Sequence, residues 1–221
     1  MKKLINKNEL QKHFFDGMSI LVGGFMAVGT PETIIDEIVN LDIRDITIIC
    51  DDAGFIDKGV GKLIVNGQVT KLIASHIGLN PEAGRLMSEN KMEVSLIPQG
   101  TLIEQIRAGG AGLGGFLTPT GLGTIVENGK EIIEINGSRY ILETPIKADL
   151  ALIYGSTVDE YGNVLYTKTT RNFNPIMATA GNKVIVEARE IVKYIDPDVI
   201  ITPHIFIDYI VKEDNNGYIW D

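Results

Sequence analysis

Short apolar runs alternate with amphipathic segments through the first half of the chain, and this alternation restricts the fold more than any other feature. The runs predict strands buried on both faces, at residues 18–24, 46–50, 71–75 and 94–98. Helices are predicted at 8–15, 59–65, 81–90 and 101–108, with another that begins near Thr30. Such alternation implies an α/β fold, an open and mainly parallel sheet with helices on both faces.

The helix after the first strand has the clearest start signal. Thr30 is a favourable N-cap residue, and Pro31 suits the first helical position. Ile34, Ile35 and Ile38 then recur at helical spacing, which predicts the buried face of this helix.

The second half of the chain has a different character. A glycine-rich segment at 109–124 is longer than most connections, so it is expected to be functional, with Phe116 and Leu117 as walls of a pocket or as core anchors. Asn136-Gly137 predicts a β-hairpin between two β-branched runs. Further strands are predicted at 149–154, 164–167 and 183–187, and a fraying tail at 213–221. With no linker, low-complexity stretch or repeat found, residues 1–221 are expected to form one domain.

Composition narrows the classes of function. The net charge is −9 and lysine and arginine are not clustered, which argues against nucleic acid and anionic membrane surfaces as partners. The sequence has no apolar run of the roughly 20 residues that span a bilayer. Cys50 is the single cysteine and is expected to be a buried small hydrophobe, so a cytoplasmic protein without disulfide or structural zinc is predicted.

The segment that follows the first strand is the first candidate binding site. Gly23 and Gly24 stand where the strand ends, and Gly29 stands just before the helix. Ligands of open α/β sheets bind outside the carboxyl ends of the strands, where glycines let the main chain come close and a helix N-terminus adds positive potential. A tight connection that needs glycine for its backbone explains the same residues. The spacing matches neither a P-loop nor a G-x-G-x-x-G fingerprint.

Polar residues at other strand ends leave alternatives open. Gln99 can donate to an oxyanion or hold a carboxylate, or it can cap a helix. Asp51 and Asp52 suit metal or acid–base chemistry, but a structural turn or a partner contact is the favoured interpretation. His76 is interpreted as structural or as reaching the edge of the site.

Longer motifs resemble a known family. Asp16-Gly17, the run Ile20-Leu21-Val22-Gly23-Gly24-Phe25, Gly29 and Pro31 resemble the first signature of the CoA-transferases. The blocks at 64–82, 97–124, 142–153 and 170–175 are similar to the A (alpha) subunit of bacterial acetate/acetoacetate/butyrate CoA-transferases, of the 3-oxoacid type. Many relatives have asparagine where this chain has Asp51-Asp52, so the charge there departs from the family pattern.

The resemblance implies a function. CoA would exchange between a short-chain acyl-CoA and a free carboxylate, with coenzyme A as acyl carrier and no metal or redox cofactor. In the family the first glycine loop lies against CoA, which makes the CoA-binding residues Gly24, Phe25, Met26, Ala27, Val28, Gly29 and Thr30. Gln99 would lie near the acyl group. Arg171 and Asn172 are expected to organise a loop or a subunit contact.

The resemblance also places the nucleophile elsewhere. In the family a glutamate of the B (beta) subunit, within Ser-Glu-Asn-Gly, forms a glutamyl-CoA thioester, and the usual assembly is A2B2. Ser88-Glu89-Asn90 is followed here by Lys91 and is predicted to be an ordinary, solvent-facing helix end, so no catalytic residue is assigned to this chain. The alternatives are a stand-alone acyl-CoA-binding or regulatory module, and a sugar-phosphate isomerase-like or deaminase-like protein.

Overall fold

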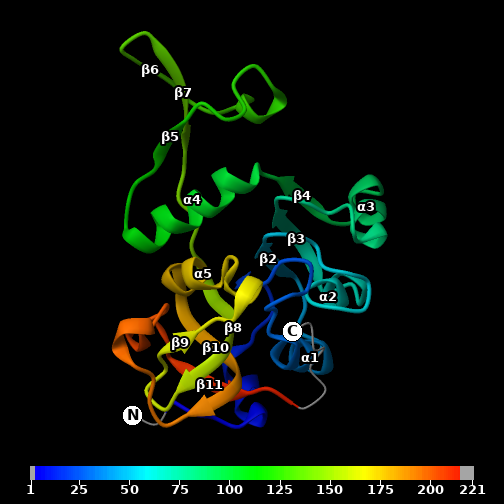
Figure 1. Cartoon of the computed structure of the whole chain (residues 1–221). Coiled ribbons are helices and arrows are strands. Elements are labelled where there is room, and N and C mark those ends of the chain that lie inside the picture. The colour runs from blue at the N-terminus through cyan, green and yellow to red at the C-terminus, as the bar shows by residue number, and fades with distance from the viewer. Residues whose placement is uncertain (1–2, 215–221) are drawn as a thin grey trace.

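The computed structural model describes residues 3–214 as two sheets with helices around them (Figure 1). The α-helices are α1 Glu32–Asn40, α2 Gly61–Val65, α3 Pro81–Ser88, α4 Gln99–Ala111 and α5 Asn174–Ala180. The strands are β1 Ser19–Val22, β2 Ile46–Cys50, β3 Val69–Ala74, β4 Glu93–Leu96, β5 Phe116–Thr118, β6 Ile132–Ile135, β7 Ser138–Glu143, β8 Ala148–Asp159, β9 Val164–Leu165, β10 Gly181–Val192 and β11 Tyr209–Lys212. Five 3-10 helices are η1 Lys7–His13, η2 Ile125–Glu127, η3 Lys168–Arg171, η4 Pro197–Val199 and η5 His204–Phe206.

The main sheet has eight strands in the order β11-β10-β8-β1-β2-β3-β4, with β9 antiparallel beside β8. All other neighbours in it are parallel, as predicted. The chain builds outward from β1 to β4, crosses through the small sheet, and returns to place β8 on the other side of β1. The strand order therefore reverses between β1 and β8, the kind of point at which open α/β sheets bind ligands.

Helices cover both faces of the main sheet, because the central strands are apolar on both sides. Ile48 of β2 packs into a core with α1, α2 and α3, whereas the next residue, Ile49, packs into a second core with α4 and α5. The predicted face of α1 is confirmed, since Ile34, Ile35 and Ile38 are all fully buried. Alternation with period two along strands that are buried throughout explains the continuous apolar runs of the sequence.

A separate three-stranded antiparallel sheet, in the order β5-β7-β6, projects beyond α4 (Figure 1). The predicted hairpin forms its tip, with Asn136 and Gly137 both at positive φ, 52° and 76°. Glu143 at the end of β7 is buried and accepts hydrogen bonds from Gln105 of α4 (2.9 Å) and Lys130 (2.6 Å). One buried carboxylate therefore ties this sheet to the main body.

Several boundaries differ from the predictions. The helix α1 begins one residue late, at Glu32 with Pro31 as N-cap, because Thr30 packs against Gly24 instead of capping. The helix α4 continues through the first glycines of the predicted loop and ends at Ala111, and β5 forms within the same segment. The short elements α5 and β11 were not predicted.

Two sequence predictions reach beyond these observations. Most of the predicted fraying tail, 213–221, lies outside the described residues, and the single-domain organisation of 1–221 stays a prediction. Within residues 3–214, no helix combines the length and apolar character needed to cross a membrane.

Candidate functional site

The candidate site begins where β1 leaves its neighbour β8. Gly23 makes the last backbone bond of this pair, donating to the Leu152 carbonyl at 2.9 Å. One step further along β8, the Tyr154 N–H donates instead to the Asn174 side chain, at 3.0 Å. A Cβ on Gly23 would stand 1.8 Å from Asn174 Oδ1, so only glycine leaves room for this substitute partner. The separation of β1 from β8 at the switch point is therefore stabilised by the Asn174 side chain, which bonds to β8 in place of β1.

The first turn, residues 24–29, is a tight hairpin. Phe25 and Val28 exchange two backbone hydrogen bonds of 3.1 and 2.9 Å. Between them, Met26 and Ala27 both have positive φ, 49° and 62°, as in a type I′ turn. Residues with a Cβ are strained in this region, by roughly 1–2 kcal/mol each. The turn therefore persists only because its surroundings fix it.

Two asparagines near the start of α5 fix the first turn. Gly24 N–H donates to Asn172 Oδ1 (3.1 Å), and Asn172 Nδ2 donates to the Val28 carbonyl (2.9 Å). Asn174 Nδ2 donates to the Gly29 carbonyl at 2.8 Å, and Asn174 is fully buried. Asn172 was expected to organise a loop, and these bonds show which loop it contacts.

A second turn, residues 54–59, lies beside the first and has the same outline. Phe55 and Lys58 exchange two backbone hydrogen bonds of 3.3 Å, and Gly54 and Gly59 have positive φ as Gly24 and Gly29 do. Asp52 joins the two turns, because its oxygens accept the N–H of Met26 (2.7 Å) and of Gly54 (2.8 Å). Burial raises the pKa of Asp52, and these two N–H groups oppose that shift.

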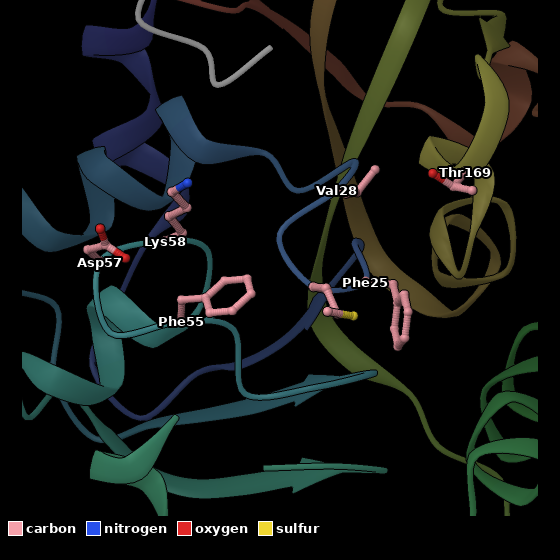
Figure 2. A pocket seen from close by; sticks show the side chains of 7 residues that line it. Phe25, Val28, Phe55, Asp57, Lys58 and Thr169 are labelled. Carbon is pink, nitrogen blue, oxygen red and sulfur yellow. The ribbon is translucent and has the colours of Figure 1, made fainter. Parts of the chain in front are cut away.

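A first pocket, called the larger pocket below, lies between the two turns and has a volume of about 560 Å³. Figure 2 shows Phe25, Val28 and Thr169 on one side of it, and Phe55, Asp57 and Lys58 on the other. Phe25 is 41% exposed although it is a large apolar side chain. The walls of this pocket are mainly apolar, and its polar groups come from Asp57, Lys58 and Thr169.

A smaller pocket of about 350 Å³ shares Phe25 and Met26 with the larger one. Its other lining residues come from three neighbouring strand ends, and they are Asp52, Ser75, His76, Leu79 and Gln99. Phe25 and Met26 therefore form a ridge between two adjoining pockets.

Asp51 lies behind the smaller pocket and is 2% exposed. Gln99 Nε2 donates to both of its carboxylate oxygens at 2.9 Å. The Ser75 hydroxyl also donates to Asp51, and its Oγ lies 2.7 Å from both Oδ1 and the carbonyl oxygen of Asp51. The carboxylate can only accept, so it fixes which end of the Gln99 amide faces inward. Within residues 3–214, no group of three or more His, Cys, Asp or Glu is placed to hold a metal ion.

The N-terminus of α1 receives a carboxylate of the protein itself. Glu187 of β10 is fully buried, and its Oε2 accepts the Ile34 N–H at 2.9 Å. Burial raises the pKa of Glu187 to about 8, against the effect of the N–H groups of Ile34 and Thr33. A helix-end N–H group that a ligand could have used is therefore already bonded within the protein.

The proposed CoA-binding residues, 24–30, all lie in or next to the first turn, but they are not equally accessible. Gly24, Gly29 and Thr30 are buried. The N–H groups of Gly24, Phe25, Met26 and Val28 already donate within the protein. The surface that this turn offers is therefore mainly side chains, whereas the sequence suggested main-chain N–H groups.

Other predictions about single residues have clear outcomes. Glu89 ends α3 on the surface, where it pairs with Lys91 (2.8 Å) and Arg85 (2.6 Å), so the ordinary helix end is confirmed. These two cations lower the pKa of Glu89. Cys50 is buried as predicted, and burial raises the pKa of its thiol. Phe116 and Leu117 lie in β5, outside the lining of both pockets.

The second turn was missed at the level of sequence, although a signal for it exists. Gly-Phe-x-x-x-Gly occurs at residues 24–29 and again at 54–59, each time after a strand and before a helix. The two segments match only over this short motif, so they do not form a longer sequence repeat. Asn174 gave no comparable signal, since its partner Gly29 lies 145 residues away in sequence.

Comparisons with known proteins support one family. Residues 5–213 match the coenzyme A transferase family model. The chain is 54% identical to the acetoacetyl-CoA:acetate/butyrate CoA transferase alpha subunit of Clostridium acetobutylicum, over 96% of this chain and 98% of that relative. It is 51% identical to the acetate CoA-transferase subunit alpha of Escherichia coli strain K12, over 95% and 96% of the two chains.

Solved structures share the fold. A thioester complex with CoA of an acyl-CoA transferase from Escherichia coli O157:H7 has a TM-score of 0.86 at 21% identity, and this chain covers about half of it (49%). Glutaconate coenzyme A-transferase from Acidaminococcus fermentans has a TM-score of 0.81 at 19% identity, over 95% of this chain and 75% of that one. The chain belongs to the coenzyme A transferase family, and its expected similarity to the alpha subunits of that family is confirmed.

Proposed function

We propose that this chain holds the CoA part of a short-chain acyl-CoA against the first turn and presents the acyl group to a nucleophile on a separate beta subunit. The observation that carries the proposal is the pair of adjoining pockets at the switch point, divided by Phe25 and Met26. Acetyl-, butyryl- and acetoacetyl-CoA are the proposed donors, by analogy with the substrates named for the relatives in Clostridium acetobutylicum and Escherichia coli.

The larger pocket suits the arm that links the nucleotide of CoA to its sulfur. That arm is an extended chain of methylene and amide groups, which matches a mainly apolar space with a few polar side chains. Phe25 and Phe55 supply apolar contact from opposite walls, and Lys58 supplies positive charge on the side of the second turn. No role is given to the N-terminus of α1, because Glu187 occupies it.

The smaller pocket suits the acyl group. At about 350 Å³ it accommodates a chain of a few carbons, and it begins on the far side of the Phe25–Met26 ridge. Gln99 stands in its wall with one N–H donated to Asp51. Its carbonyl oxygen and second N–H remain for contact with the acyl carbonyl or with an acetoacetyl keto group.

The nucleophile is proposed to come from the partner. A glutamate carboxylate of the beta subunit would attack the acyl carbonyl and release CoA thiolate, which forms an acyl-glutamyl anhydride. The thiolate would then attack the glutamyl carbonyl, release the carboxylate product and leave a glutamyl-CoA thioester. Glu89 of this chain is held on the surface by Arg85 and Lys91. Two alpha and two beta chains in the cytoplasm are the proposed assembly and location.

Reconstitution tests the proposal directly. The purified chain is expected to show no exchange between acetyl-CoA and butyrate, and addition of a beta chain that contains Ser-Glu-Asn-Gly is expected to give turnover. Exchange by the isolated chain would contradict the placement of the nucleophile. Binding of acyl-CoA without turnover in the mixture would favour the stand-alone binding module.

A substitution in the ridge tests the place of CoA. Phe25→Ala removes apolar contact from both pockets and is expected to raise the KM for acetyl-CoA about tenfold, from the loss of roughly 1.5 kcal/mol of burial. Phe15→Ala is the matched control, because Phe15 is 54% exposed and lies outside both pockets. Gly24→Val is a poorer test, since its Cβ would stand 1.9 Å from Thr30 Oγ1 and would disturb the turn itself.

A further inference from the structure

Two consecutive carboxylates stand at one wall of the smaller pocket. Asp52 lines the pocket, and Asp51 lies directly behind the lining residues Ser75 and Gln99. Both carboxylates are buried, 2% and 6% exposed. Each accepts hydrogen bonds on both oxygens, Asp52 from two backbone N–H groups and Asp51 from Gln99 and Ser75. Burial raises the pKa of Asp52, and its two N–H partners oppose that shift.

The hydrogen bonds of Asp51 also determine what the pocket wall presents. Ser75 has a single hydroxyl hydrogen, and it points to Asp51, so only oxygen lone pairs of Ser75 face outward. At Gln99 Nε2, the angle between the two Asp51 oxygens is smaller than the angle between the two N–H bonds of the amide. A single N–H is therefore shared between the two Asp51 oxygens. The polar wall is therefore rich in acceptors, with one remaining Gln99 N–H as an amide donor.

Positive charge at this wall is sparse. His76 is the basic side chain among the lining residues of the smaller pocket. Lys58 lines the larger pocket, on the other side of the ridge. An acyl chain that extends into the smaller pocket thus approaches two carboxylates and a single imidazole.

We propose that Asp51 and Asp52 restrict the acyl donor to chains with an uncharged end, such as acetyl, butyryl and acetoacetyl, and reject dicarboxylic acyl groups such as succinyl. This inference rests on the proposed function and adds the substrate class to it. A distal carboxylate would lose its hydration to enter a wall of acceptors and like charge, and like-charge contacts of this kind strongly disfavour a wrong partner.

Butyryl-CoA and succinyl-CoA form a matched pair for the test, because a carboxylate in succinyl replaces the terminal methyl of butyryl. With the reconstituted alpha–beta complex and acetate as acceptor, acetyl-CoA formation gives kcat/KM for each donor. We expect a preference for butyryl-CoA of about 100-fold, since each tenfold step corresponds to about 1.4 kcal/mol. Equal use of the two donors would overturn the inference while it leaves the proposed function intact. Exchange with neither donor would refute the proposed function and the inference with it.

A substitution locates the cause of the preference. Asp51→Asn removes one charge but keeps a side chain that can bond to Gln99 and Ser75, and it is expected to raise the succinyl/butyryl ratio of kcat/KM about tenfold. The ratio is independent of the fraction of active enzyme. Asp42→Asn is the control, because Asp42 is exposed in an ion pair with Arg44 in the α1–β2 connection, which enters β2 at the end opposite to Asp51.

The outcome is decisive in either direction. A ratio for Asp51→Asn within twofold of the wild type, or the same rise in Asp42→Asn, would overturn the role given to Asp51. If Asp51→Asn loses turnover with butyryl-CoA, the ratio is measured in Asp51→Ala, which also removes the charge but makes no new hydrogen bond to Gln99.

Discussion

The two turns at the candidate site have a similar backbone outline and differ in the contacts that stabilise it. Both run from one positive-φ glycine to another, with a Phe at the first bridge position. In the first turn Met26 and Ala27 also have positive φ, whereas in the second turn Ile56 and Asp57 do not. The first turn is therefore strained between its glycines and the second is not.

The difference matches what each turn contacts. The first turn lines both pockets and is fixed by Asn172 and Asn174, far along the chain. The second turn lines the larger pocket only, and its Gly59 N–H donates to the nearby Glu32 at 2.7 Å. Strain in a backbone commonly marks a functional position. In the proposed function, the first turn would therefore orient the ligand and the second would enclose it.

The largest expected effect comes from the asparagine beneath the first turn. Asn174→Ala would leave the Tyr154 N–H and the Gly29 and Thr170 carbonyls without their partner in a buried place. We expect the free energy of unfolding to fall by about 3 kcal/mol or more, from about 1–3 kcal/mol for each unsatisfied group. Urea denaturation followed by circular dichroism measures this change.

Asn80 provides the matched substitution beneath the second turn. It is 1% exposed, donates to the Ala53 carbonyl and caps α3 through the N–H groups of Glu82 and Ala83. Asn80→Ala is expected to cost less, about 1–2 kcal/mol, because its two capping bonds are long, 3.1 and 3.3 Å, and the Glu82 N–H is only partly buried, so that water can replace its partner. Equal losses for the two variants would remove the distinction between the turns.

The second prediction concerns the helix that follows the first turn. The pKa of Glu187 is about 8 in the folded protein, above the ordinary value of 4.5 that the unfolded chain retains. The folded state therefore binds this proton more tightly, and its contribution to stability is lost as the pH rises from about 5 to 8. Glu187→Gln should remove a slope of at most about 1.4 kcal/mol per pH unit.

Unfolding by urea at pH 5.5 and pH 8.0 tests this expectation. The stability of Glu187→Gln relative to the wild type should increase between the two pH values, and parallel losses in both proteins would refute it. Glu32, near the second turn, offers the contrast. Burial raises its pKa, but an ion pair of 2.5 Å with Lys62 opposes the shift. Glu32→Gln should therefore change the pH dependence less.

The smallest effect tests the strain itself. Ala27→Gly is expected to stabilise the protein by about 1 kcal/mol, because glycine adopts a φ of 62° without the Cβ conflict. Asp57→Gly, at the equivalent place in the second turn, should instead be destabilising by about 0.5–1 kcal/mol through the entropy of the unfolded chain. Differential scanning calorimetry separates the two signs, and a loss of stability in both variants would show that the first turn is not strained.

Local patterns were enough to predict much of the fold. The apolar runs predicted the parallel core strands, and Asn136-Gly137 predicted the hairpin, because each of these features depends on neighbours in sequence. The start of α1 was predicted one residue too early, because the Thr30 side chain packs against Gly24 and does not cap the helix. The strand β11 was missed, since its pairing with β10 depends on tertiary contacts at the edge of the sheet.

The candidate site was predictable only in part. Gly24 and Gly29 marked the first turn, because a positive φ requires glycine at such positions. The joint role of Asp52 in two turns depends on a contact between strand ends, and single-sequence patterns do not specify which donors a carboxylate meets. For the same reason the orientation of Gln99 by Asp51 emerged from the structure alone.

The bonds between the first turn and Asn172 have a consequence for the order of folding. They join residues 148 positions apart, so they can form only after most of the chain has been synthesised. A nascent chain that ends before α5 can pair β1 with β2, yet it lacks the contacts that offset the strain at Met26 and Ala27. The candidate site is therefore completed among the last parts of the protein, and an unfinished chain lacks it.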